Sequence, residues 1–209
     1  MKLRWLLFVF LLTAGTALAR TPVVLVVGDS LSAGYGIDLH TGWVSLLQER
    51  VRQQGYPHSV VNASISGDTS AGGRARLADI LKRQSPDILI LELGANDGLR
   101  GLPLSATRAN LDAMIKTAKA DGVRVLLVGI HIPPNYGPDY SKKFHAIYAD
   151  LARANHVARV PFLLDGVALD PALMQTDRLH PRATAQPRIL GNVWPHLQPL
   201  LKPQKRNPD

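Results

Sequence analysis

The sequence predicts an α/β protein, built as a three-layer α/β/α sandwich around a central parallel sheet of about five strands. Two observations lead to this prediction. Short runs of apolar residues recur along the chain without polar alternation, which is typical of strands buried on both faces of a parallel sheet. Segments with apolar residues at helical spacing separate these runs, and a helix that joins two strands in this way makes them parallel.

The apolar runs are the predicted strands. The first covers residues 23–27 and stops at Gly28. Because ligands bind beyond the carboxyl ends of the strands in such a sheet, we expect functional residues just after these runs. The later runs cover residues 60–61, 88–93, 123–130 and 160–164.

The segments between the runs place apolar side chains on one face of a helix. A closing helix is expected over residues 182–200, although Pro187, Gly191 and Pro195 predict that it is irregular or kinked. The apolar residues of the four earlier faces are Trp43, Val44, Leu46, Leu47 and Val51; Leu77, Ile80 and Leu81; Leu111, Met114, Ile115 and Ala118; and Phe144, Ile147, Tyr148 and Leu151.

The composition is that of a globular protein. The chain has 209 residues, 46% of them hydrophobic and 19% charged, and no cysteine, which excludes disordered, collagenous and disulfide-stapled chains. A chain of this length buries roughly 70% of the surface that its unfolded form exposes. We therefore predict a single domain over residues 20–209, with a flexible tail from about residue 202, and we expect a monomer.

The first nineteen residues have the features of a signal peptide. Lys2 and Arg4 are followed by the apolar run 6–12, and Ala17-Leu18-Ala19 matches the pattern that signal peptidase cleaves. A retained membrane anchor is the alternative, but this apolar stretch is short for the ~20 residues that a membrane span needs. We expect cleavage before Arg20 and export to the periplasm or the medium.

The net charge of the chain is +8. A solubilising surface charge is the usual reason for such a value, and at most it predicts peripheral contact with an anionic membrane. The sequence has no stripe of Lys and Arg interleaved with aromatic residues, so we do not expect it to bind nucleic acid.

Four polar or glycine-rich blocks stand where strands of the predicted sheet should end. They are Gly28-Asp29-Ser30-Leu31-Ser32, Ser66-Gly67-Asp68-Thr69, Gly94-Ala95-Asn96-Asp97 and Asp177-Arg178-Leu179-His180. Each block alone is more typical of a turn or a helix cap than of a catalytic site. Together they hold every part of an acyl-transfer site, in a fold whose strand ends converge.

The residue types in these blocks suggest a role for each. Ser30 is the candidate nucleophile, and His180 would accept its proton because imidazole titrates near neutral pH. Asp177 stands three residues before His180, so in a tight turn its carboxylate would reach the other ring nitrogen. The backbone N–H groups of Ser30 and Gly67, with the side-chain amide of Asn96, would form the oxyanion hole.

These four blocks, in this order, resemble the SGNH branch of the GDSL hydrolases. The resemblance covers essentially the whole mature chain and implies the flavodoxin-like SGNH hydrolase fold, with Ser30, Gly67, Asn96, Asp177 and His180 in the roles above. It also implies a broad esterase without a cofactor, acting on small acyl esters and thioesters such as acyl-CoA, lysophospholipids and aryl esters. Two mild departures are Ala95, where a second glycine is expected, and Arg178-Leu179, where Gly-Ile is common.

Apolar loops follow two of the predicted strands and suggest a groove for the acyl chain. Packing of these loops against the protein explains any one of the residues equally well, but as a set beside Ser30 they predict substrate binding. The predicted substrate-binding residues are Leu99, Leu102, Ile132, Pro133 and Tyr136.

Two other functions remain open on the sequence alone. An SGNH carbohydrate O-acetylesterase would need a small polar pocket instead of an apolar groove. A non-enzymatic flavodoxin-like binding module could hold a cation with Asp29 and Asp97 at the strand ends. A larger α/β-hydrolase is disfavoured because no Gly-x-Ser-x-Gly elbow occurs, and the dispersed histidines give no zinc-binding pattern.

Overall fold

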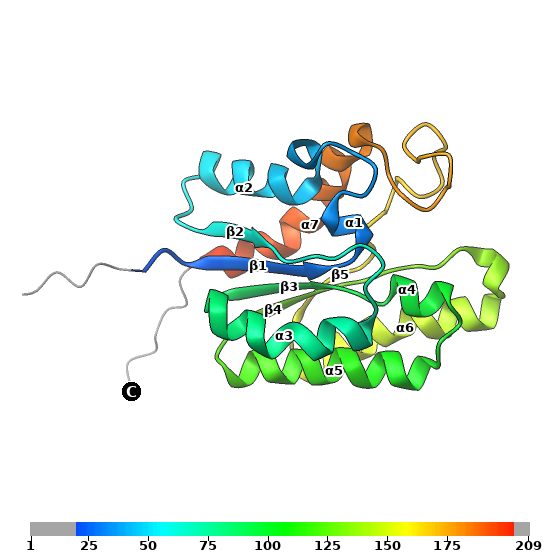
Figure 1. Cartoon of the computed structure of the whole chain (residues 1–209), viewed down its shortest axis with the longest axis horizontal. Helices are drawn as coiled ribbons and strands as arrows, with labels where there is room; N and C mark the ends of the chain where they lie inside the picture. The colour runs from blue at the N-terminus through cyan, green and yellow to red at the C-terminus, as the bar shows by residue number, and fades with distance from the viewer. Residues whose placement is uncertain (1–19, 203–209) are drawn as a thin grey trace, which may run out of the picture.

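A computed structural model of the chain describes residues 20–202. It contains a five-stranded parallel sheet in the order β2-β1-β3-β4-β5, with helices on both faces (Figure 1). The predicted three-layer sandwich is confirmed. The predicted signal peptide, and all but the first residue of the predicted tail, lie outside the described residues. Within residues 20–202, no helix has the length and apolar character that a membrane span requires.

The sheet is buried on both faces, which explains its uninterrupted apolar runs. In β1, Val24 and Val26 pack into one core cluster while Leu25 and Val27 pack into the other, and all of them are fully buried. This alternation is the period of two that a strand imposes on its side chains. The strands are β1 (Val23–Gly28), β2 (Ser59–Asn62), β3 (Ile88–Glu92), β4 (Arg124–Val128) and β5 (Ala158–Val160).

Helices cover the two faces unequally. Helices α2 (Trp43–Gln53) and α7 (Gln186–Leu201) pack on one face, and their apolar stripes belong to one core cluster. Helices α3 (Ser70–Gln84), α5 (Leu104–Ala120) and α6 (Pro138–Asn155) contribute to the cluster on the opposite face. The two groups lie above and below the sheet in Figure 1.

Two segments differ from the expectation. The fifth predicted strand is confirmed, but it covers Ala158–Val160 instead of residues 160–164, because Pro161 has no N–H to continue the ladder. The N–H of Leu163 donates instead to the carbonyl of Gly129 at 3.0 Å, and the chain turns away from the sheet. The closing helix is preceded by the short 3₁₀ helix η3 (Ala183–Ala185), and α7 then continues through Pro195.

Because all strands are parallel, their carboxyl ends meet at one edge of the sheet, here called the carboxyl edge; the opposite edge is the amino edge. Four short helices lie in the loops of the carboxyl edge. They are α1 (Ser30–Ala33), η1 (Leu39–Thr41), α4 (Ala95–Leu99) and η2 (Pro134–Tyr136). The first and third of these carry Ser30 and Asn96, so the fold brings the polar blocks to this edge.

Candidate active site

Ser30 is the first residue of α1, directly beyond β1. The side chain of Asp29 caps this helix, with Oδ1 accepting the N–H of Leu31 at 3.1 Å. Gly34 ends the helix in the left-handed conformation, at φ 77°, and its N–H donates to the carbonyl of Ser30. Ser30 is therefore held on a single helical turn that is closed at both ends.

His180 and Asp177 form one turn that faces Ser30. Asp177 Oδ1 accepts the backbone N–H groups of Leu179 at 2.9 Å and of His180 at 3.0 Å, while Oδ2 lies 2.7 Å from His180 Nδ1. Because a carboxylate only accepts, Nδ1 carries the proton, and Nε2 accepts from the Ser30 hydroxyl at 2.9 Å. Tyr35 packs on the imidazole, with 4.4 Å between the ring centroids.

These contacts set the charge of Asp177. Burial alone would raise its pKa, but the hydrogen bonds from the His180 ring and from the two backbone N–H groups outweigh it and lower the pKa to about 2. Asp177 is therefore ionised near neutral pH. A charged carboxylate in this position stabilises a protonated imidazole on His180.

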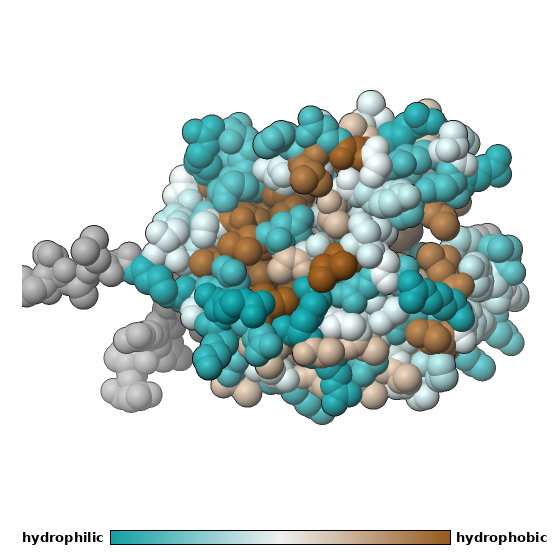
Figure 2. Space-filling model, in the orientation of Figure 1, coloured by the Kyte–Doolittle hydropathy of each residue, from teal (hydrophilic) through white to brown (hydrophobic). Residues whose placement is uncertain are grey.

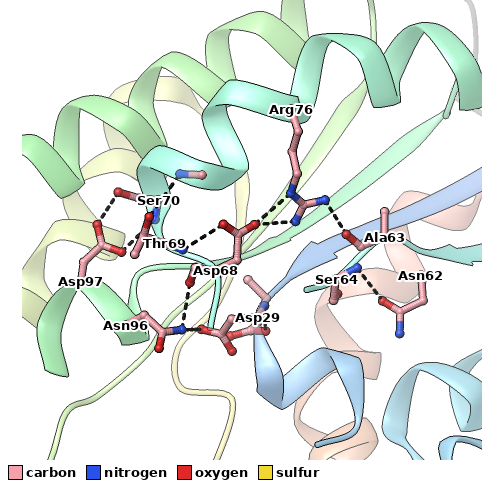
Figure 3. A network of polar contacts seen from close by, with 12 residues as sticks. Asp29, Asn62, Ala63, Ser64, Asp68, Thr69, Ser70, Arg76, Asn96 and Asp97 are labelled. Carbon is pink, nitrogen blue, oxygen red and sulfur yellow. Dashed lines mark hydrogen bonds and ion pairs between the residues drawn. The ribbon is translucent and has the colours of Figure 1, made fainter. Parts of the chain in front are cut away.

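Asn96 lies in the first turn of α4, which follows Gly94 in its left-handed conformation at φ 117°. Its side-chain amide donates to the carbonyl of Asp68 at 2.8 Å and, over a longer distance of 3.3 Å, to Asp29 Oδ2 (Figure 3). Asp68 is itself held by Arg76 through an ion pair of 2.8 Å. The amide is thus fixed in place between the loops that follow β1 and β2.

Gly67 precedes the carbonyl to which Asn96 donates. Its φ of 81° lies in the left-handed region that favours glycine, and its own carbonyl accepts from Arg100 at 3.0 Å. Within residues 20–202, the backbone N–H groups of Gly67 and Ser30 donate to no protein acceptor. The structure thus places Gly67 beside the Asn96 network but outside the cavity wall described below.

Two buried acids lie near Ser30: Asp29, which the sequence suggested only as a cation ligand, and Glu92, which the sequence did not suggest as a site residue. Glu92 and Asp29 are fully buried, and Glu92 Oε2 accepts the Ser32 hydroxyl at 2.7 Å and the Asp29 N–H at 3.3 Å. Burial raises the pKa of Asp29 to about 7 and the pKa of Glu92 well above its usual value. The signal that could have found Glu92 is an acid inside an otherwise apolar strand.

A cavity of about 520 Å³ opens beside the Ser30 hydroxyl, and Ser30, Asn96 and His180 lie in its wall. Of the predicted substrate-binding residues, Leu99, Ile132 and Pro133 line it. Leu102 and Tyr136 do not; the Leu102 N–H donates to the carbonyl of Asp97, and the Tyr136 hydroxyl donates to the carbonyl of Leu99. Leu102 and Tyr136 therefore hold the end of helix α4, which carries Leu99, in place.

Much of the cavity wall comes from residues 162–174, between β5 and Asp177, which were not predicted to belong to the site. The side chains of this segment are mostly apolar, so the cavity continues away from Ser30 and His180 as a hydrophobic chamber suited to a hydrocarbon chain. The wall residues from this segment are Phe162, Leu163, Leu164, Ala168, Leu169 and Met174.

The acids that a cation-binding module would use are engaged elsewhere. Asp97 Oδ2 accepts the N–H of Ser70 at 2.8 Å, and Oδ1 accepts the Thr107 hydroxyl at 3.2 Å. Asp29 caps α1 and accepts from Asn96. Across the described part of the chain, no three His, Asp or Glu side chains converge as metal ligands would. The geometry gives no support to the cation-binding interpretation.

Comparison with known proteins gives one consistent result. The sequence pattern of the GDSL-like lipase/acylhydrolase family matches residues 26–186. Over 186 residues the chain is 51% identical to esterase TesA of Pseudomonas aeruginosa, covering 89% of this chain and 92% of that protein. It is 43% identical over 201 residues to thioesterase 1/protease 1/lysophospholipase L1 of Escherichia coli K12, covering 95% of this chain and 94% of that protein.

The solved structures agree with the sequence relatives. A crystal structure of TesA superposes with a TM-score of 0.84 at 52% identity, over 85% of this chain and 99% of that one. The residues matched by the family pattern, 26–186, include all four polar blocks.

Proposed function

The chain belongs to the GDSL-like lipase/acylhydrolase family, and from this premise we propose that it is a serine esterase that hydrolyses acyl esters and thioesters through an acyl-enzyme on Ser30. The observation that carries the proposal is the chain of contacts from Asp177 through His180 to the Ser30 hydroxyl at the mouth of an apolar cavity. A nucleophile, a base and a group that orients the base are the parts that acyl transfer requires.

In the first half of the reaction, Ser30 Oγ attacks the acyl carbon while its proton passes to His180 Nε2. Asp177 stabilises the imidazolium that forms. As the tetrahedral intermediate collapses, the bond to the leaving oxygen or sulfur breaks and His180 returns the proton to that atom. In the second half, His180 takes a proton from water as the water oxygen adds to the acyl carbon. The second tetrahedral intermediate then collapses, the bond from the acyl carbon to Ser30 Oγ breaks, and His180 returns the proton to Oγ as the acid leaves.

The negative oxygen of the tetrahedral intermediate needs donors in addition to the triad. We assign this role to the N–H groups of Ser30 and Gly67 and to the Asn96 amide. The bond of Asn96 to Asp29 is the longer of its two, so the substrate oxygen would replace Asp29 as the acceptor while the bond to Asp68 keeps the amide in place. Such a preset donor contributes more in the transition state than in the ground state.

The cavity favours long acyl chains over acetyl groups. Its wall beyond Ser30 is lined mainly by apolar side chains, and its volume of about 520 Å³ far exceeds what an acetyl group fills. Each methylene buried there contributes up to about 0.8 kcal/mol, nearly fourfold in kcat/KM. We therefore propose fatty acyl esters, acyl-CoA and lysophospholipids as the substrate class, in preference to acetylated carbohydrates.

Other parts of the proposal rest on the sequence. We propose that residues 1–19 direct export and are removed, that residues 20–209 act as a single domain, and that the enzyme works as a monomer in the periplasm or the medium without a cofactor. Amino-terminal sequencing of the exported protein tests the cleavage site, and sedimentation tests the monomer.

A rate panel with 4-nitrophenyl esters of increasing chain length tests the function. The expected result is that kcat/KM rises over short chains and then levels off when the cavity is filled. A serine-directed organophosphate should label one residue, Ser30. A preference for acetyl esters would replace the acyl esterase with the carbohydrate esterase, and a protein that neither hydrolyses esters nor takes the label would be a binding module.

A further inference from the structure

Exposed large hydrophobic side chains gather at one edge of the molecule. In residues 20–202 there are six of them, and each lies in a loop that leads from the carboxyl end of a strand to the next helix of the outer layers. The amino edge of the described chain exposes none. They are Tyr35 and Leu39 after β1, Ile65 after β2, Tyr136 after β4, and Leu169 and Leu179 after β5.

This distribution needs a physical reason, because singly scattered apolar residues are common on protein surfaces but a one-sided collection is not. In the space-filling view, brown side chains reach the surface at the right-hand end, beyond α1 and α4, where these loops lie (Figure 2). A separate brown area covers β2 and β1, but there Val60 and Val61 are half-buried and the N–H of Val60 is bound by Gln48.

The exposed residues are continuous with the cavity. Leu169 and Leu179 belong to the cavity wall and are nevertheless 94% and 40% exposed, so the apolar lining extends outward onto the surface. Tyr35, 53% exposed, packs on the catalytic imidazole at the same mouth. We call Tyr35, Leu169 and Leu179 the apolar rim. An acyl chain in the cavity would pass the apolar rim without crossing polar surface.

The cationic residue Arg178 lies next to the apolar rim. Arg178 precedes Leu179, lines the cavity and forms no ion pair with any side chain of the described chain. Exposed aspartates on the same edge keep the face from being strongly basic, so apolar contact dominates and a phosphate group adds a smaller attraction through Arg178. These aspartates are Asp38, Asp139, Asp165, Asp170 and Asp177.

We propose that the apolar rim docks the protein on a phospholipid surface, with the cavity mouth toward the lipid, so that single-chain lipids enter the cavity directly from that surface. The proposal rests on the acyl esterase function and names where its substrate comes from. An apolar rim around an acyl-binding cavity matches a surface made of acyl chains, and an unbound arginine matches its phosphates.

The test uses the Ser30→Ala protein, so that no lipid is hydrolysed during the measurement. Vesicles of phosphatidylcholine, with and without phosphatidylglycerol, are the probe. In this background Leu169→Trp should shift its emission to the blue on vesicle binding and be quenched by brominated acyl chains. Gln54→Trp, on the amino edge, should do neither.

Sedimentation with the same vesicles gives the strength of binding. Leu169→Ser should weaken partitioning by roughly tenfold, the scale of one buried leucine, whereas Gln54→Leu, which adds a leucine at the amino edge, should leave it unchanged. Arg178→Gln should remove most of the gain from phosphatidylglycerol. Leu169 is almost fully exposed, so its replacement removes little core packing.

Three results would overturn the proposal: equal partitioning of the parent and Leu169→Ser proteins, equal quenching of Leu169→Trp and Gln54→Trp, or a dimer that Leu169→Ser dissolves while vesicles bind nothing. The last would assign the rim to a second copy of the chain. Hydrolysis of monomeric 4-nitrophenyl esters by the wild-type protein distinguishes the esterase proposal from the lipid-docking proposal. If the wild-type protein hydrolysed no ester, the esterase function would be refuted, while vesicle binding could still be measured.

Discussion

At the amino edge of the sheet, two non-glycine residues in the left-handed conformation end helices, whereas at the carboxyl edge the non-glycine residue in this conformation lies inside the turn of Asp177 and His180. Ser85, at φ 43°, and His156, at φ 51°, cap the carboxyl ends of α3 and α6. Arg178, at φ 57°, lies between Asp177 and His180 and lets both following N–H groups reach one carboxylate oxygen. A left-handed non-glycine residue has a steric cost. At the amino edge this cost is accepted to end a helix, and at the carboxyl edge it is accepted to form the turn that holds Asp177 and His180.

The acids of the two edges differ in burial and in ion pairing. At the amino edge, Asp87 accepts the N–H of Val23 at 2.7 Å and pairs with Arg20 at 3.0 Å, near solvent. At the carboxyl edge, Asp29 and Glu92 are buried side by side in the sheet layer and form no ion pair with any described cation. At the amino edge Asp87 is thus paired with a nearby cation, whereas at the carboxyl edge Asp29 and Glu92 are buried without a cation, and their pKa values are raised where they support the turn that carries Ser30.

The largest expected difference between the two edges is in kcat, when the nucleophile at the carboxyl edge is removed. Ser30→Ala should lower kcat by roughly 10⁶-fold, the scale known for the serine of a Ser-His-Asp triad, because no other group near His180 can form the acyl-enzyme. Ser85→Ala, at the amino edge, should leave kcat unchanged. Steady-state hydrolysis of a 4-nitrophenyl ester measures both, and a Ser30→Ala protein with ordinary turnover would refute the mechanism.

The next largest difference is expected between Asn96 at the carboxyl edge and Asn155 near the amino edge. Asn96→Ala should reduce kcat by about 10² to 10³, or some 2.7 to 4 kcal/mol, with a smaller change in KM, because its amide acts on the transition state. Asn155 is equally placed between polar groups, bonding Asp112 at 2.8 Å near the amino edge. Asn155→Ala should lower the free energy of unfolding by about 1 to 2 kcal/mol and leave kcat intact; the reverse pattern would make Asn96 a purely structural residue.

The buried acids make stability depend on pH with a definite sign. Asp29 loses its proton near pH 3.8 in the unfolded chain but near pH 7 in the folded protein, because burial raises its pKa to about 7. The unfolded chain therefore binds fewer protons between these values, and the free energy of unfolding should fall as the pH rises through this window. Each such group contributes a slope of at most about 1.4 kcal/mol per pH unit.

Urea unfolding at a series of pH values measures this slope. Asp29→Asn should flatten it, and the free energy of unfolding would then change less between pH 4 and pH 7. Asp112→Asn is the control: hydrogen bonds from Lys116 and Asn155 lower the pKa of Asp112, so its contribution is lost only in acid. Burial lowers the pKa of His58 and His131, which gives an opposing slope that cancels between parent and variant. An unchanged slope in Asp29→Asn would contradict the assignment.

The smallest effects concern the left-handed residues themselves. Glycine adopts this conformation without steric cost, so Ser85→Gly and Arg178→Gly should each raise the free energy of unfolding by up to about 1 kcal/mol. Ser85→Gly should leave kcat/KM unchanged, whereas Arg178→Gly should lower it several-fold because the turn that carries Asp177 and His180 gains freedom. Thermal unfolding and ester hydrolysis check the pair, and identical behaviour of both variants would remove the functional contrast between the edges.

The structure follows most closely from the sequence where a local pattern determines it. Strands β1, β3 and β4 are largely apolar runs, and three of the four polar blocks follow β1, β2 and β3, so both could be predicted. The wall formed by Phe162, Leu164 and Met174 could not, because these residues lie in turns without a helical or strand period. The burial of Asp29 and Glu92 likewise depends on tertiary packing that no local pattern reveals.

The contact between His180 Nε2 and Ser30 Oγ joins groups 150 residues apart in the chain. Asp177 and His180 belong to one turn and therefore form together. The contact between this turn and Ser30 is the long-range contact that completes the triad. All five strands precede residue 177, so a nascent chain would contain its whole sheet before this contact can form, whereas the core beneath α2 still waits for α7. The enzyme would therefore be inert during most of its synthesis, and it would become active only after residues 177–180 had folded against the turn that follows its first strand.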